Sequence, residues 1–292
     1  MTTTSLGVIG VSNTAETGMP WRVTDRALVL TPEVGSVRLA WRAFGPMVAY
    51  EVHGVPGRRE GWRPNGSTLI SVTTTTGFVH RGLGAYGATW SYRVLAVTSD
   101  GEHLMTPLAV TTTTTSVTVT GRPIAVVGAF DGSGLDLAIS SSGFVHYRTT
   151  FPSDVDFRYG FDSPERRWSY VQPGPEDAWA GRRSHRFRLR FDLDELPAGD
   201  VDLALWLVDR HPTRAGSASI AVNCVPLETL LFDETIGETH VSLVMPGSGA
   251  GPAYFEIPVP RDLLRLGENT VDIAKDHGSW IAYDAIGVFG RG

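Results

Sequence analysis

The chain has 292 residues, with 31 acidic and 25 basic side chains and a net charge of −6. Hydrophobic residues make up 42% of it, which suits a globular protein of one large or two smaller domains. The acidic balance argues against a nucleic-acid partner, because nucleic-acid binding depends on a basic surface. No membrane partner is expected, since no segment approaches the roughly eighteen apolar residues that span a bilayer. Cys224 is the only cysteine, which excludes an intrachain disulfide.

Residues 1–20 form an N-terminal segment that lacks the basic start and long apolar centre of a secretion signal. From Val23 onward, strand-like stretches recur at intervals of about ten residues, separated by Gly, Pro, Asn and Asp. This pattern is typical of β-sandwiches, so we expect an all-β chain. The clearest helix candidate is the segment 260–270, which opens at Pro260 and has Gly267 as its C-cap.

The first predicted domain covers residues 21–120. Apolar residues alternate in two of its strands, at Val37, Leu39 and Trp41 and at Tyr92, Val94 and Ala96. With a tryptophan in an early strand and the run WSYRVLAV before a turn, the domain resembles a fibronectin type III module. The resemblance implies a spacer or a docking surface.

The second predicted domain covers residues 121–292 and begins after the turn TGRP at residues 120–123. Apolar residues alternate through it, as at Phe187, Leu189, Phe191 and Leu193 and again at Val201, Leu203, Leu205 and Leu207. So many strands in one segment predict a jelly-roll β-sandwich of two sheets around an apolar interior.

The segment 168–181, WSYVQPGPEDAWAG, is unusually rich in aromatic residues for a turn. A loop cannot readily bury three large rings without leaving backbone polar groups unpaired. We therefore expect Trp168, Tyr170 and Trp179 to offer flat faces to a sugar. Asp177, Arg182 and Arg183 would supply polar edges, and the arginine fork suits a uronate carboxylate. The competing interpretation is that one tryptophan plugs an end of the sandwich.

Two further turns carry polar and aromatic groups, DRHPTR at 209–214 and KDHGSW at 275–280. We expect them to gather with the 168–183 segment at one end of the sandwich, although three unrelated solvated loops would give the same sequence. The predicted carbohydrate-binding residues are Trp168, Tyr170, Asp177, Trp179, Arg182, Arg183, His185, His211, His277 and Trp280.

The phrases FRLRFDLDELPAGDVDLALWLVD, FEIPVPRDLLRLGENTVDI and WIAYDAIGV resemble the C-terminal module of rhamnogalacturonan lyases of polysaccharide lyase family 4. The resemblance implies a fibronectin type III-like module followed by a carbohydrate-binding-like jelly roll, and an extracellular location. It also implies that lysine and histidine act in a preceding catalytic sandwich. Lys275 is the only lysine and falls within the jelly roll, so no catalytic residue is carried over and the catalytic residues are unknown.

The leading hypothesis is a protein that binds an acidic, pectin-like polysaccharide or oligosaccharide. One alternative is a polysaccharide lyase acting by β-elimination, with a histidine as base, an arginine to neutralise the uronate carboxylate and a tyrosine as acid. The candidates for these roles are His185, His211, His277, Arg182, Arg183, Arg210, Tyr170 and Tyr283. The other alternative is a protein-interaction module that docks through the first domain.

No cofactor is expected. A structural calcium ion could find oxygen ligands among the aspartates, although none of them has EF-hand spacing. The candidates are Asp131, Asp136, Asp154, Asp156 and Asp162.

Overall fold

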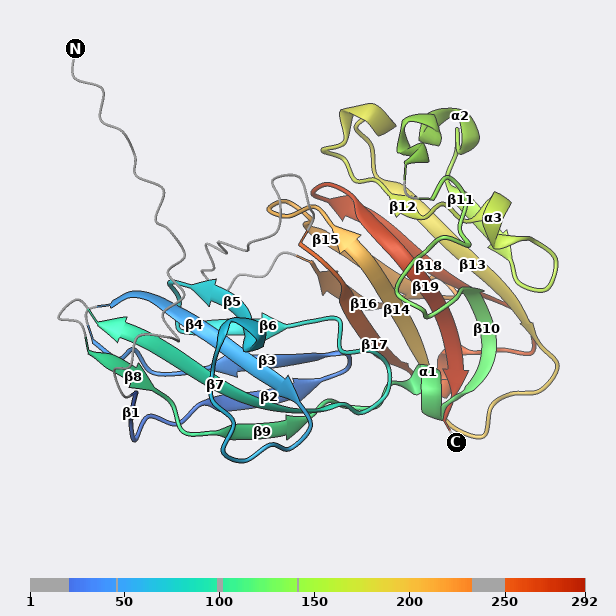
Figure 1. Ribbon diagram of the computed structural model, residues 1–292. Coiled ribbons are helices and arrows are strands. Elements are labelled where there is room, and N and C mark those ends of the chain that lie inside the picture. Colours follow the sequence, from blue (N-terminus) through green and yellow to red (C-terminus); the bar gives the residue numbers. More distant parts are fainter. Residues whose placement is uncertain (1–20, 46, 99–101, 141, 233–249, 292) are drawn as a thin grey trace, which may run out of the picture.

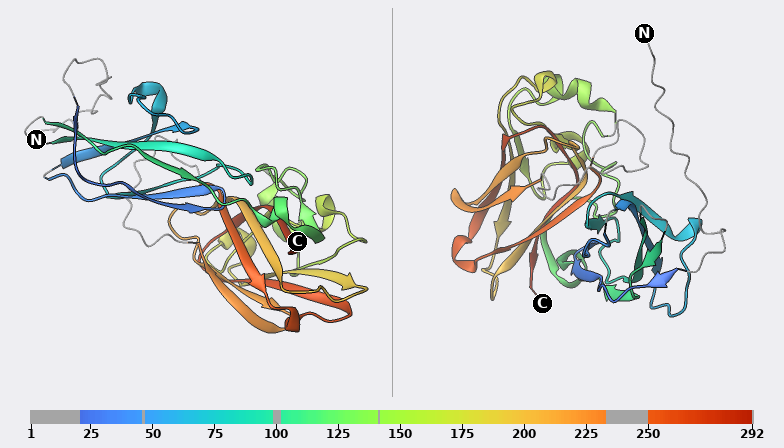
Figure 2. Two further views of the ribbon diagram at one scale, coloured as in Figure 1. Left: turned by 90° about the horizontal axis from the view of Figure 1, so that it is seen from below. Right: turned by 90° about the vertical axis from the view of Figure 1, so that its left-hand side faces the viewer.

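The computed structural model describes residues 21–45, 47–98, 102–140, 142–232 and 250–291. They form two β-sandwiches that lie side by side, the first in blue to green and the second in yellow-green to red (Figures 1 and 2). Strands dominate, so the prediction of an all-β chain is confirmed. Among the described residues, none of the helical segments could span a membrane.

The first sandwich contains β1 (Arg22–Val23), β2 (Val29–Glu33), β3 (Ser36–Ala40), β4 (Met47–Pro56), β5 (Leu69–Thr73), β6 (Gly77–His80), β7 (Thr89–Thr98), β8 (His103–Met105) and β9 (Ala109–Thr112). One sheet has the order β1-β8-β7-β4-β5, with β9 also paired to β7, and the other has the order β2-β3-β6. The alternating residues of β3 and β7 face each other in the core, where Val37, Leu39, Tyr92 and Val94 are fully buried.

The second sandwich contains β10 (Arg122–Gly128), β11 (Val155–Arg158), β12 (Val171–Gln172), β13 (His185–Leu193), β14 (Val201–Arg210), β15 (Ser217–Val222), β16 (Val225–Leu231), β17 (Ala253–Val259), β18 (Gly267–His277) and β19 (Ile281–Gly290). Its sheets have the orders β10-β19-β14-β17, with β12 paired to β19, and β11-β13-β18-β15-β16. Every second residue of β13 is buried, because one side of a strand in a sandwich faces the opposite sheet.

Helical turns are short. They are η2 (Gly66–Thr68), α1 (Val117–Thr120), η3 (Gly143–His146), α2 (Tyr147–Thr150), α3 (Pro164–Arg167), η4 (Ala178–Ala180) and η5 (Arg261–Leu263). The helix expected between Pro260 and a C-cap at Gly267 is shorter than predicted, because only η5 forms there. Gly267 has φ +76° but opens β18, which pairs with β13 from Leu193 to His185. Sheet pairing over that length replaces the helical hydrogen bonds.

The two sandwiches are in contact where α1 joins them. Glu256 of β17 accepts hydrogen bonds from the Ser116 hydroxyl and, at 3.1 Å, from the Val117 amide. Gly35 has φ +60°, and a Cβ there would lie 2.5 Å from Cε2 of Tyr254. The close approach therefore needs a glycine at this turn.

Candidate functional site

Three loops meet at the end of the second sandwich where β13 and β15 begin and β14 and β18 end. The His211 amide donates to the Trp280 carbonyl at 3.0 Å, and the Ser279 amide donates to the Arg214 carbonyl at 2.6 Å. The Glu176 amide donates to the Gly278 carbonyl at 3.2 Å. The three segments expected to gather at one end of the sandwich are thus brought together.

Glycines allow this close packing of the loops. Gly216 and Gly278 have φ of +66° and +76°, which side chains rarely adopt. A Cβ at Gly216 would lie 2.4 Å from the His277 carbonyl oxygen, and one at Gly174 would lie 2.2 Å from the Gly278 carbonyl oxygen. The backbone geometry of the loops is therefore closely fixed.

The buried side chain of Asp177 forms hydrogen bonds with groups of two of these loops. It is 5% exposed. Its Oδ1 accepts hydrogen bonds from Trp179 Nε1 at 3.1 Å and Ser279 Oγ at 2.6 Å, while Oδ2 accepts from the Gly174 amide at 2.8 Å. The expectation of a sugar-contacting Asp177 is wrong, because its oxygens are buried and used within the protein. It acts as a positioning residue.

The half-buried rings of Tyr170, His211 and Trp280 form what we call the loop-end surface. Tyr170 precedes β12, and its carbonyl accepts from the Tyr283 amide of β19 at 2.7 Å. The His211 and Trp280 rings lie 6.1 Å apart at an angle of 71°. Burial, and then the negative charge of Asp209, raise the pKa of Tyr170, so its phenol stays protonated.

Charged groups border the loop-end surface. Arg214 forms an ion pair with Glu176 at 3.1 Å, and both side chains are largely exposed. His211 Nδ1 accepts from the Arg214 amide at 3.0 Å, which fixes the orientation of the imidazole. Arginine and histidine therefore stand beside an aromatic ring, a combination suited to an acidic sugar.

Trp179 is also half-buried and is held rigidly. Phe144 of η3 and Tyr147 of α2 approach its ring nearly edge-on, with centroids at 5.6 Å and 5.9 Å. Phe144 remains 42% exposed. Sequence reasoning missed this ring, although the apolar run in GFVHY, residues 143–147, was a signal of it.

Trp168 is fully buried, so the expectation that it contacts sugar is wrong. Its ring packs edge-on against Phe187 at 5.3 Å and Tyr283 at 5.6 Å. The loop can bury this ring because its backbone groups form hydrogen bonds with residues that are distant in the sequence. The Trp168 carbonyl accepts from the Ala138 amide at 2.9 Å. Trp168 is therefore the tryptophan that fills the interior at this end of the sandwich, as the competing interpretation held.

His185 is 1% exposed and cannot contact a sugar, which corrects a further expectation. Its Nδ1 lies 3.1 Å from the Tyr147 hydroxyl. Burial, and then the Arg183 charge, lower the pKa of His185 to about 4. The imidazole is therefore neutral near pH 7.

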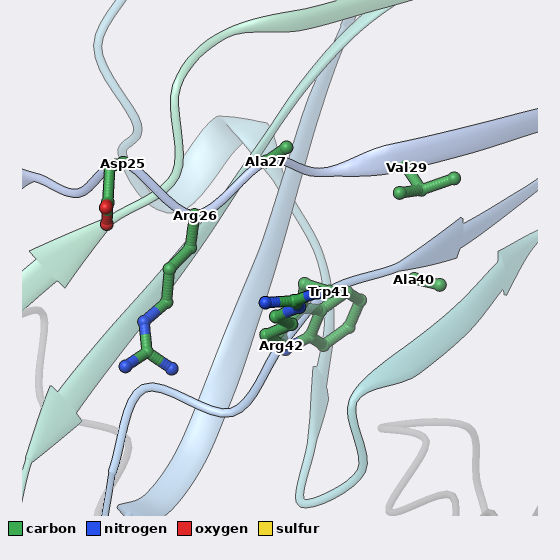
Figure 3. A pocket seen from close by; sticks show the side chains of 7 residues that line it. All are labelled: Asp25, Arg26, Ala27, Val29, Ala40, Trp41 and Arg42. Atoms are coloured by element: carbon green, nitrogen blue, oxygen red, sulfur yellow. The ribbon is translucent and has the colours of Figure 1, made fainter.

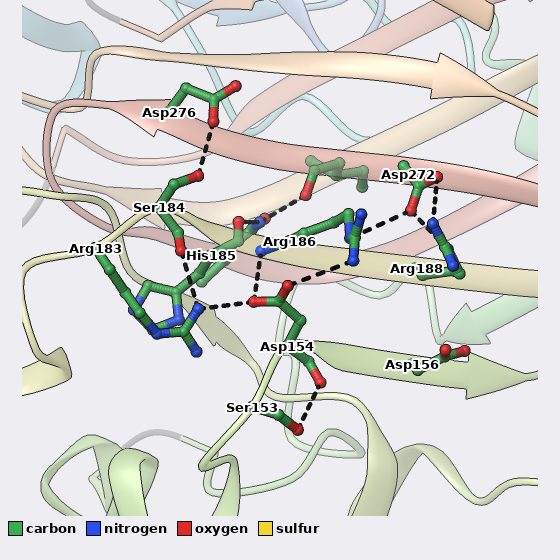
Figure 4. A network of polar contacts seen from close by, with 12 residues as sticks. Ser153, Asp154, Asp156, Arg183, Ser184, His185, Arg186, Arg188, Asp272 and Asp276 are labelled. Atoms are coloured by element: carbon green, nitrogen blue, oxygen red, sulfur yellow. Dashed lines mark hydrogen bonds and ion pairs between the residues drawn. The ribbon is translucent and has the colours of Figure 1, made fainter. Parts of the chain in front are cut away.

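The remaining predicted residues differ in whether their side chains are available to contact a ligand. Arg183 forms an ion pair with Asp154 at 2.8 Å, within a polar network on the outer face of β13 (Figure 4). Arg182 and His277 are exposed, and neither side chain forms a hydrogen bond or ion pair with a described residue. The structure thus places the His211 and Trp280 rings together, Tyr170 close to Asp209, and Trp179 beside Phe144.

Three groups proposed for β-elimination are structural. Arg210 is 4% exposed and donates to the carbonyls of Phe232 and Gly251, both at 3.0 Å. Tyr283 is fully buried and donates to Gln172, and burial raises its pKa well above the ordinary value. With His185 also enclosed, that hypothesis loses three of its candidate groups.

Three of the five aspartates considered for calcium are engaged by other groups of the protein. Asp154 and Asp156 pair with Arg183 and Arg190, and Asp162 accepts from the Arg158 amide at 2.7 Å. Within the described ranges, no group of three or more His, Cys, Asp or Glu residues could hold a metal ion.

The fold and the converging loops define a β-sandwich module with an aromatic surface at one end. The family model for polysaccharide lyase family 4, domain III, described as CBM-like, matches residues 124–288, more than half of the chain. The chain belongs to this family, and the predicted resemblance is confirmed.

Solved structures are similar to parts of the chain at low identity. A family 35 carbohydrate-binding module from an environmental isolate is 15% identical, covering 38% of this chain and 67% of that one, with a TM-score of 0.26. The family 35 module of Cellvibrio japonicus Abf62 is 16% identical with the same coverage and TM-score. Pectate lyase PelI from Erwinia chrysanthemi, in complex with tetragalacturonic acid, is 16% identical over 34% of this chain and 30% of that one, with a TM-score of 0.24. No curated protein sequence matches the chain.

Proposed function

We propose that the protein binds an acidic, pectin-like polysaccharide or oligosaccharide at the loop-end surface. The observation that carries the proposal is the pairing of the His211 and Trp280 rings at one end of a sandwich that belongs to a CBM-like family, with Tyr170 close to Asp209 of the strand that leads to His211. A preformed site has a low entropic cost of ordering on binding.

The chemistry of the loop-end surface fits a uronate. Aromatic faces cover the C–H patches of a pyranose ring, and polar edges bind its hydroxyls. Arg214 can turn from Glu176 to a ligand carboxylate, because an exposed ion pair contributes only about 0–1 kcal/mol. Arg214 would then supply selectivity for acidic over neutral sugars.

Isothermal titration with oligogalacturonate and rhamnogalacturonan oligosaccharides tests the proposal. Trp280→Ala is expected to weaken binding at least tenfold, while Phe161→Ala, a control at a 74% exposed ring, leaves it unchanged. A second variant, His211→Ala, guards against a folding defect in the first. Equal affinity in the wild type, Trp280→Ala and His211→Ala would contradict the proposal. Absence of binding to every acidic oligosaccharide would also contradict it.

The same samples separate the alternatives. Growth of unsaturated-uronate absorbance that depends on His211 would favour a lyase over a binding protein. Capture of a protein partner through the first sandwich, with no saccharide bound, would favour an interaction module.

A further inference from the structure

The first sandwich contains a pocket of about 720 Å³, shown from close by in Figure 3. Its residues are distant in sequence from those of the loop-end surface. It is lined by Asp25, Arg26, Ala27, Val29, Ala40, Trp41 and Arg42. Val29 and Ala40 are paired in register where β2 begins and β3 ends. The volume falls within the range of small-molecule sites.

Two guanidinium groups line this pocket without a carboxylate partner. Arg26 and Arg42 form no ion pair with any described residue, whereas Arg188 and Arg190 are bound to carboxylates. Arg26 instead lies over the Phe44 ring, 5.7 Å from its centroid. With Asp25 as the only acid, the lining has a net positive charge.

Trp41 adds a buried donor to the lining. It is 6% exposed, and its Nε1 is buried without a hydrogen-bond acceptor in the described structure. The ring is held edge-on against Tyr50, with centroids 5.3 Å apart. The N–H is enclosed by protein, and the indole can report on the pocket because its ring forms part of the lining.

We propose that this pocket is a second saccharide site that takes a carboxylate-bearing sugar, a uronate. Arg26 and Arg42 would bind the carboxylate, and Asp25 would accept a hydrogen bond from a sugar hydroxyl. The apolar side chains of Ala27, Val29 and Ala40 would lie under the C–H face of the ring. The proposal rests on the proposed function only for the choice of a uronate.

Asp25 favours a sugar over a simple anion. A carboxylate beside the two arginines repels a small dianion such as phosphate, yet it suits a ligand that carries hydroxyl donors beside one negative charge. The chain would then hold one acidic polymer at two places, which raises its effective affinity when a ligand spans both.

Nitrogen-15 NMR of the full chain tests the pocket through the indole N–H of Trp41, assigned with Trp41→Phe. The probes are digalacturonate, neutral galactobiose and inorganic phosphate. Digalacturonate is expected to shift the Trp41 resonance, and galactobiose and phosphate are not. Arg26→Gln with Arg42→Gln should weaken this response at least tenfold, while Arg63→Gln, at an exposed arginine outside the pocket, should not change it.

The outcomes separate the two proposals. A response of Trp41 that persists in the Trp280→Ala protein supports the pocket independently of the loop-end surface. A response at Trp280 but not at Trp41 overturns the pocket alone, and the reverse overturns the loop-end surface alone. Equal shifts with phosphate and digalacturonate would show a general anion site and overturn the saccharide assignment.

Discussion

The Asp177 carboxylate holds together groups from two loops that no motif in the sequence connects. Its three hydrogen bonds fix Trp179, Ser279 and Gly174 beneath the loop-end surface. Such a buried acceptor stabilises the protein mainly because its loss leaves several donors unsatisfied.

Replacing Asp177 tests this role at the residue scale. Asp177→Ala should lower the free energy of unfolding by about 2 kcal/mol or more, since unpaired buried donors cost about 1–3 kcal/mol each. Asp177→Asn should lose less, because one oxygen remains an acceptor. Urea unfolding of the three proteins measures the difference, and equal stabilities would contradict the role.

Asp284 gives a prediction about pH. It is 1% exposed, and its Oδ1 accepts from the amides of Gly132 and Ser133, while burial raises its pKa to about 6. The folded state therefore binds a proton more tightly than the unfolded state. The stabilisation it gives is complete below pH 3.8 and is lost as pH rises through 6.

The variant Asp284→Asn should remove this contribution. The difference in free energy of unfolding, variant minus wild type, should increase by about 1 to 3 kcal/mol as the pH rises from 4 to 7. Differences between the two proteins isolate Asp284 from carboxylates such as Asp154, whose pKa is lowered. A difference independent of pH would refute the assignment.

Among the strands, β11, β13 and β19 enclose Trp168 through the rings of Phe157, Phe187 and Tyr283. Trp168→Ala should destabilise the protein by about 3–5 kcal/mol, as expected for removal of a buried aromatic ring. Binding at the loop-end surface should change little below the melting temperature. Thermal unfolding and titration together check both statements, and a stable variant with lost binding would restore Trp168 as a contact residue.

The hydrogen bonds around α1 give the prediction for the joint between the sandwiches. Glu256→Ala removes the acceptor for Ser116 and Val117, so amide exchange in residues 116–120 should speed up at least tenfold. Glu228→Ala, at an exposed carboxylate of β16, is the matched control. Unchanged exchange at 116–120 would show that apolar contacts alone hold the joint.

Strands were predictable because burial on one side of a sheet imposes a period of two, as along Phe187, Leu189 and Phe191. The convergence of the loops at 211 and 280 was also predictable, since both lie at strand ends. The burial of Trp168 was not, because its backbone partner Ala138 is thirty residues away in sequence. The pairing of Arg26 and Arg42 in one pocket likewise depends on the register of β2 with β3.

In the whole molecule, the two sandwiches are in contact through the Glu256 hydrogen bonds and the approach of Tyr254 to Gly35, and each sandwich carries one of the two proposed sites. A ligand long enough to reach both would bind more tightly than a short one, while a ligand that cannot span them would gain nothing. The binding affinity should therefore depend on the chain length of the saccharide.

A crystal structure of the full chain with bound oligogalacturonate would locate the saccharide site. We expect a uronate ring stacked on Trp280 or Tyr170, with its carboxylate at Arg214. Saccharide bound elsewhere on the second sandwich, with the loop-end surface occupied only by water, would contradict it.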